Sequence, residues 1–145
     1  MKLREIMEMS TPDIENVELK IRKSFNSVGI IINFTKHFGD RIVHNAVDEK
    51  GHKRDNISPE ELLNTFDKLK DHHNQIFAEA HQFTDEVKRG EFEGVIMDIF
   101  KRINVPFALE FDKRKGKFIL TCKTIMKRDN FLTKPKDHVI TLRGK

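Results

Sequence analysis

The stretch PFALEFDKRKGKFILTC, residues 106–122, indicates the fold class of this chain. In its first part, Pro106–Asp112, every second residue from Phe107 is apolar, which is the pattern of a half-buried strand. The basic segment KRKGK (113–117) follows, and its glycine can adopt the positive φ that a tight turn requires. Apolar residues then resume over Lys117–Met126. The stretch therefore predicts a β-hairpin with a long second strand.

Two shorter strands are expected on either side of this hairpin. Ile30–Phe34 is a β-branched run, and His138–Leu142 (HVITL) is a second one near the end of the chain. The segment DEKGHKRDN (48–56) is polar and charged, so we expect a loop there.

Helical periodicity dominates the region before the hairpin. Pro12–Phe25 begins with capping residues and repeats apolar residues at helical spacing, and Lys36–Ala46 is expected to be a second helix. Ser58-Pro59-Glu60-Glu61 is the signature of a capping box, which predicts a helix running to about Gln82. Thr84–Glu93 is expected to be a polar turn. Phe92–Ile103 shows some helical periodicity.

Helices followed by a hairpin and a further strand predict an α+β domain, with helices packed on a small, mostly antiparallel sheet. We expect one compact domain overall, in which residues 1–29 form an N-terminal helical extension and residues 30–145 the α+β domain.

Composition limits the class of protein. The chain has 145 residues, 37% of them hydrophobic and 34% charged, and a single cysteine, which fits a reducing compartment. The first ten residues lack the apolar core of a signal peptide, and no run approaches the ~20 apolar residues of a membrane span. We expect no membrane partner and a place in the cytoplasm.

Basic residues are concentrated in the last quarter of the chain. From Asp112 to Lys145 there are eleven Lys or Arg against three Asp, a formal charge of +8. The preceding residues hold 16 basic and 20 acidic side chains, or −4. A basic segment of this kind is typical of a surface that binds a polyanion such as RNA, although a lysine-rich surface also keeps a small protein soluble.

The segment TKHFGDRIVH (35–44) has a high density of reactive side chains. On a helix, His37 and His44 lie two turns, about 10 Å, apart, which is too far for one shared metal ion. The other histidines lack the spacing of zinc ligands, and Cys122 lies in a predicted strand among apolar residues. Gly-rich phosphate loops and GxSxG are absent from the sequence. We therefore expect neither a metal nor another cofactor.

Acid–base cleavage of RNA is one chemistry that these residue types could support. Histidine carries protons near neutral pH, and Arg and Lys stabilise charge on a phosphorane. His37 and Arg41 on a helix could meet Lys123, Lys127 and Arg128 on the sheet across one cleft. The alternative is that these residues have no catalytic role. Asp40 and Arg41 would then form surface ion pairs, and Lys123 and Lys127 would lie on the solvated face of a strand.

The order of elements resembles the RelE-like group of small ribonucleases, which includes phage endoribonucleases and BrnT-type toxins. The matching segments are HFGDR (37–41), ISPEE (57–61) and LTCKTIMKRDNF (120–131). The resemblance covers roughly residues 30–142. Where relatives often carry a further Arg or His, this chain has His44-Asn45, and its segment 84–102 is longer than expected.

The resemblance implies a small antiparallel sheet with helices packed against it. It also implies metal-independent cleavage of RNA. His37 would be the general acid or base and Arg41 a phosphate ligand, whereas Lys123, Lys127 and Arg128 would line the RNA side of the sheet. The remaining candidates would bind substrate: His44, Lys113, Arg114, Lys115 and His138.

Two alternatives belong to other classes. A nucleic-acid-binding module without chemistry would need only the basic segment. A virion or assembly protein could contact a neighbour through an exposed strand edge or through the N-terminal helix, whose apolar face comprises Ile14, Val17, Ile21 and Phe25.

Overall fold

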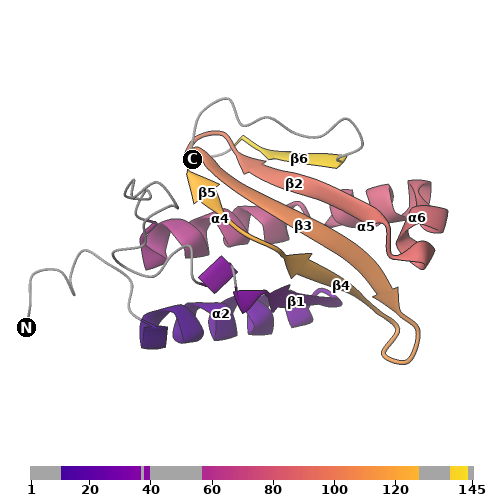
Figure 1. Ribbon diagram of the computed structural model, residues 1–145, viewed down its shortest axis with the longest axis horizontal. Coiled ribbons are helices and arrows are strands. Elements are labelled where there is room, and N and C mark those ends of the chain that lie inside the picture. Colours follow the sequence, from indigo (N-terminus) through magenta and orange to yellow (C-terminus); the bar gives the residue numbers. More distant parts are fainter. Residues whose placement is uncertain (1–10, 37, 40–56, 128–137, 144–145) are drawn as a thin grey trace, which may run out of the picture.

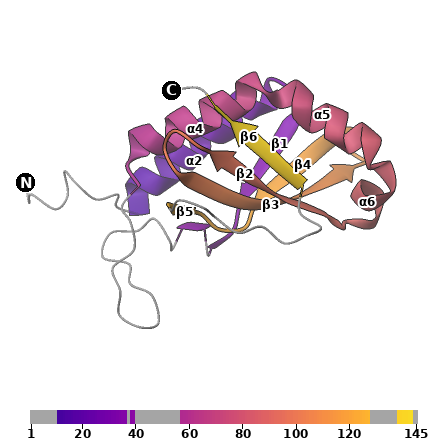
Figure 2. The ribbon, with the colours of Figure 1, turned by 90° about the horizontal axis from the view of Figure 1, so that it is seen from above.

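The computed structural model describes residues 11–36, 38–39, 57–127 and 138–143, and these form a sheet with helices along one face (Figures 1 and 2). The helices are α2 (Thr11–Asn26), α4 (Pro59–Asp71), α5 (His73–Gln82) and α6 (Thr84–Arg89). The strands are β1 (Ile30–Phe34), β2 (Phe92–Asp98), β3 (Ile103–Asp112), β4 (Lys117–Cys122), β5 (Met126–Lys127) and β6 (His138–Leu142). The predicted α+β class is confirmed, with α2 preceding the sheet. No helix in these ranges has the length and apolarity needed to cross a membrane.

The sheet is mixed, with the strand order β1-β4-β3-β2-β6 and β5 paired to the beginning of β3. Its centre is an antiparallel meander of β2, β3 and β4. The two outer strands are parallel to their neighbours, β1 to β4 and β6 to β2. The meander contains the predicted hairpin, and Gly116 has the expected positive φ of 64°.

The second strand of the hairpin is shorter than predicted, because β4 ends at Cys122 rather than Met126. Pro106 explains the early end. The Lys123 N–H donates to the Pro106 carbonyl at 2.9 Å, but proline has no N–H with which to return the bond. The ladder stops there, and the chain resumes pairing with β3 only at β5.

Helix α2 is part of the common core. Its apolar face of Ile14, Val17, Ile21 and Phe25 is buried in the same cluster as the strand residues, and Phe25 meets Phe66 of α4 edge to face at 6.3 Å. The face proposed as a contact for an assembly partner is therefore covered within the chain.

Helix α4 begins as predicted. The Ser58 hydroxyl accepts the Glu61 N–H at 3.1 Å, and the Glu61 carboxylate accepts the Ser58 N–H at 3.2 Å, which completes the capping box. The helix ends at Asp71, and a separate helix α5 starts after His72, so the expected single helix to Gln82 is two helices.

Two predictions for the following segment were wrong. The expected polar turn contains helix α6, which ends at Gly90 with φ 69°. Phe92–Asp98, expected to be partly helical, is strand β2. The error has a physical cause: β2 is central, and both Val95 and Ile96 are buried although they lie on opposite faces of the sheet. A strand buried on both faces loses the alternation that distinguishes it from a helix.

Gly94 allows the close approach of the neighbouring chain segments at the middle of β2. A Cβ at this position would collide with the backbone carbonyl of His138 in β6 and lie 2.9 Å from the Phe107 ring in β3. Only a residue without a side chain fits between them.

We predict that Gly94→Ala lowers the free energy of unfolding by about 2 kcal/mol or more. The added methyl group would meet the backbone carbonyl of His138, which cannot move aside as a flexible side chain can. Urea denaturation followed by circular dichroism measures this. Gly39→Ala is the matched control, because a Cβ there meets nothing within 4 Å. Equal stability of the two variants would contradict the close approach.

Candidate nucleic-acid interface

Four of the predicted site residues, His37, Arg41, His44 and Arg128, lie outside the described residues. The chain immediately before His37 is described, and Thr35 fixes it. The Thr35 hydroxyl donates to the Lys123 carbonyl at 2.6 Å and accepts the Phe38 N–H at 3.1 Å. The Thr35 N–H donates to the Cys122 carbonyl at 3.1 Å. A helical turn at Lys36 thus starts directly beside the end of β4.

The Lys123 carbonyl can accept the Thr35 hydroxyl because Pro106 leaves that acceptor unused in the ladder. The Thr35 hydroxyl therefore joins the two sequence segments that carry the predicted catalytic groups, although Thr35 and Lys123 are 88 residues apart in sequence.

The side chains of Lys123 and Lys127 point to opposite sides of the sheet. Lys123 Nζ lies 2.7 Å from the Glu93 carboxylate, and Glu93 projects away from the helices because its neighbour Phe92 is in the core. Lys127 Nζ lies 2.7 Å from the Glu61 carboxylate of α4, on the side that the helices cover. The two lysines do not line one common face.

The other predicted substrate-binding residues are also separated. Lys113, Arg114 and Lys115 form the exposed β3–β4 turn, in which the Asp112 carboxylate accepts the N–H groups of Arg114 and Lys115. Lys127 pairs with Ile103 at the other end of β3, about 30 Å from this turn at ~3.3 Å per residue.

His138 lies in a third place, between β6 and the helices. Its ring stacks on Phe92 with the centroids 4.0 Å apart, and Nε2 lies 2.8 Å from the Glu86 carboxylate. The second ring nitrogen lies 3.6 Å from the Glu79 carboxylate. The His138 side chain is only 13% exposed, so these contacts indicate an anchor between β6 and the helices rather than a ligand contact.

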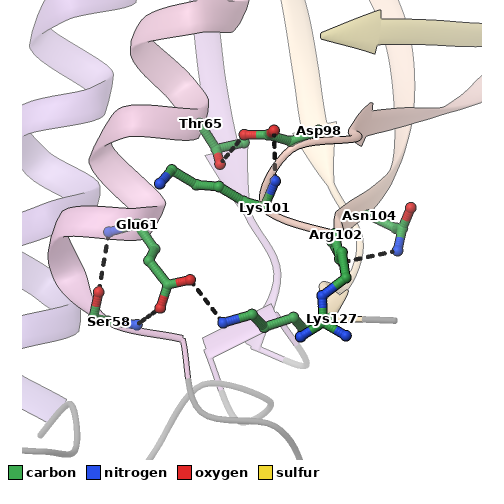
Figure 3. Close-up of polar contacts among 8 residues, drawn as sticks. All are labelled: Ser58, Glu61, Thr65, Asp98, Lys101, Arg102, Asn104 and Lys127. Atoms are coloured by element: carbon green, nitrogen blue, oxygen red, sulfur yellow. Dashed lines mark hydrogen bonds and ion pairs between the residues drawn. The ribbon is translucent and has the colours of Figure 1, made fainter. Parts of the chain in front are cut away.

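A polar cluster that the sequence did not predict lies where β2 turns into β3 (Figure 3). Asp98 ends β2 with a side chain that is 0% exposed. Its carboxylate accepts hydrogen bonds from the Thr65 hydroxyl at 2.7 Å, from Lys68 Nζ at 2.9 Å and from the Lys101 N–H at 3.2 Å. One buried carboxylate thus joins helix α4 to the β2–β3 turn.

The same turn is tied to β5 through Asn104. Arg102 has a φ of 59°, a conformation that residues with a side chain seldom adopt. The buried Asn104 amide donates to the carbonyls of Arg102 at 3.3 Å and of Met126 at 3.4 Å. The turn therefore holds one conformation against both α4 and β5.

Glu61 connects this cluster to the helix start. Burial raises the pKa of Glu61, but the hydrogen bonds from Lys127 and Ser58 outweigh burial, so its pKa lies below the usual value of 4.5. The carboxylate is therefore ionised at neutral pH. The stability that it contributes is present above pH 4.5 and is lost as the pH falls through the lowered pKa.

Four cationic side chains from three parts of the chain converge here, and we call them the basic corner: Lys68, Lys101, Arg102 and Lys127. Lys68 pairs with Asp98 at 2.9 Å, and Lys127 pairs with Glu61 at 2.7 Å. The corner contains no histidine or cysteine. Its chemistry therefore suits the binding of phosphate groups rather than proton transfer.

The described residues offer little for other chemistries. Among them, no three His, Cys, Asp or Glu side chains are placed to hold a metal ion. Cys122 is fully buried in the core, and burial raises the pKa of its thiol, so that it does not act as a nucleophile.

Comparison with known proteins adds no relative: no protein-family model, curated protein or solved structure matches this chain.

We predict that Asp98→Ala lowers the free energy of unfolding by about 3 kcal/mol, because it breaks a largely buried ion pair with Lys68. Urea denaturation measures the change. The control is Glu91→Ala, which breaks the exposed ion pair of Glu91 with Arg89 and should leave the stability unchanged. A similar small effect of both substitutions would show that Asp98 does not hold the turn to α4.

Proposed function

We propose that this chain binds RNA through the basic corner. The observation that carries the proposal is the convergence of Lys68, Lys101, Arg102 and Lys127 on a turn whose backbone is held by Asp98 and Asn104. Fixed cations bind phosphates at a low cost in side-chain and loop ordering. The charge of +8 from Asp112 to Lys145 supports the same class of ligand.

The basic corner differs from the surface that the sequence predicted. The exposed turn of Lys113, Arg114 and Lys115 is about 30 Å away along β3, so one short RNA segment would not contact both. The corner is favoured because its cations come from α4, the β2–β3 turn and β5, which define a shape as well as a charge.

We predict that Lys101→Ala weakens binding of a single-stranded RNA and lowers the slope of log K against log salt by about 0.7, the value for one lost phosphate contact on a single strand. Fluorescence anisotropy at several salt concentrations measures both quantities. Lys20→Ala, an exposed lysine on the outer side of α2, is the control and should keep the wild-type slope.

Binding that is unaffected by Lys101→Ala but weakened by Lys113→Ala would move the interface to the β3–β4 turn. Absence of salt-dependent RNA binding by the wild-type chain would overturn the proposal.

A second candidate function is metal-independent cleavage of the bound RNA, with His37 as general acid or base and Arg41 as phosphate ligand. The Thr35 bond to the Lys123 carbonyl supports it, since the segment that leads to His37 starts beside the segment of Lys123. The resemblance to RelE-like ribonucleases supports the same chemistry. The pairing of Lys123 with Glu93 and of Lys127 with Glu61 counts against a direct catalytic role for these two lysines.

For this second candidate, we predict that His37→Ala reduces the rate of RNA cleavage by about 10²–10⁴-fold, the usual effect of losing a general acid or base. Labelled RNA incubated in EDTA and separated by electrophoresis gives the rate. His81→Ala, an exposed histidine of α5, is the matched control. Binding without turnover by the wild-type chain would leave the first proposal and remove the second.

A further inference from the structure

Two large apolar side chains lie exposed in the β2–β3 turn, next to the basic corner. Ile99 is 51% exposed and Phe100 is 57% exposed, whereas most apolar residues of β2 and β3 are buried. The sequence IFKRI (99–103) thus places an exposed aromatic ring directly before two cations. Exposed apolar groups that are bordered by charged residues commonly mark a contact surface.

The backbone on both sides of Phe100 is held in place. The Ile99 N–H donates to the Leu142 carbonyl of β6 at 3.1 Å, and the Lys101 N–H donates to the Asp98 carboxylate at 3.2 Å. The ring is therefore presented from a fixed turn. A rigid aromatic side chain loses little conformational entropy when a ligand covers it.

Two ammonium groups lie over the ring. Lys68 Nζ and Lys101 Nζ each lie 5.8 Å from the Phe100 ring centroid, close to the outer limit of ~6 Å for a cation–π contact. Phe100 nevertheless stays 57% exposed to solvent. An exposed aromatic ring with cations beside it matches a nucleotide, which joins a flat base to a phosphate.

We propose that Phe100 is a stacking platform for an unpaired base, which makes single-stranded RNA the ligand class of the basic corner. This inference rests on the proposed RNA-binding function and extends it to the form of the RNA. The base lies on the open part of the Phe100 ring, and Lys101 and Arg102 contact the adjoining phosphates. A duplex fits poorly, because its bases are already stacked on one another and do not offer a free face.

The absence of Trp and Tyr from the chain provides a direct test. In the full-length variant Phe100→Trp, a single indole reports on the platform, and stacking against a base quenches its fluorescence. The probes are a twelve-nucleotide oligouridylate, an abasic strand of the same length, and a blunt RNA duplex. We expect quenching by the oligouridylate and little by the abasic strand or the duplex.

Affinity for the oligouridylate gives the second readout. Phe100→Ala should weaken binding by roughly 5- to 150-fold, the usual loss for one base–aromatic stack, and should weaken abasic-strand binding much less. Phe111→Ala and Phe111→Trp are the matched controls, because Phe111 is also an exposed phenylalanine, 42% open, at the far end of β3. They should show wild-type affinity and no quenching.

The outcomes separate the two proposals. If the wild-type chain binds RNA and Phe100→Ala binds it equally well, the stacking platform is overturned and the RNA-binding proposal stands. Failure of the wild-type chain to bind any of the probes overturns both. A wild-type oligomer that Phe100→Ala converts to a monomer would assign the ring to a contact between copies and overturn the platform.

Discussion

The buried carboxylate of Asp98 is the interaction on which the architecture of the basic corner depends. Its three hydrogen bonds come from the helix layer and from the turn of the sheet, so one side chain sets the distance between the two layers at this end. A buried charge is tolerated only when it is paired and fully hydrogen-bonded, as Asp98 is. The exposed ring of Phe100 and the strained backbone of Arg102 both follow from a turn that is held in this way.

The fold class and most elements could be predicted from local patterns. The capping box at Ser58, the glycine of the hairpin turn and the apolar periodicity of α2 are signals contained within a few residues, and the structure has all three. The central strand β2 could not be predicted in this way. Its apolar residues face both sides of the sheet, so its burial depends on strands and chain segments far away in sequence.

The candidate site was harder to predict than the fold, for a related reason. The sequence predicted a site from basic residues that are adjacent along the chain, such as residues 113–115. In the structure, the length of β3 separates these residues from Lys127. The basic corner gathers residues from positions 68, 101–102 and 127, which are far apart in the sequence. The role of Pro106 could not be predicted from the sequence either. Because Pro106 has no N–H, the β3–β4 ladder ends there and the Lys123 carbonyl can accept the Thr35 hydroxyl.

The parallel outer strand β1 can pair only after most of the chain has been synthesised. Its partners in β4 begin at Phe118, 88 residues after Ile30, so at ~5–20 residues per second the ribosome supplies them roughly 4–18 s later. During that time IIINF is an uncharged, β-branched segment with no ladder to join. Helix α2 is made first and packs against β1 in the finished fold, which makes it well placed to shield this strand in the nascent chain.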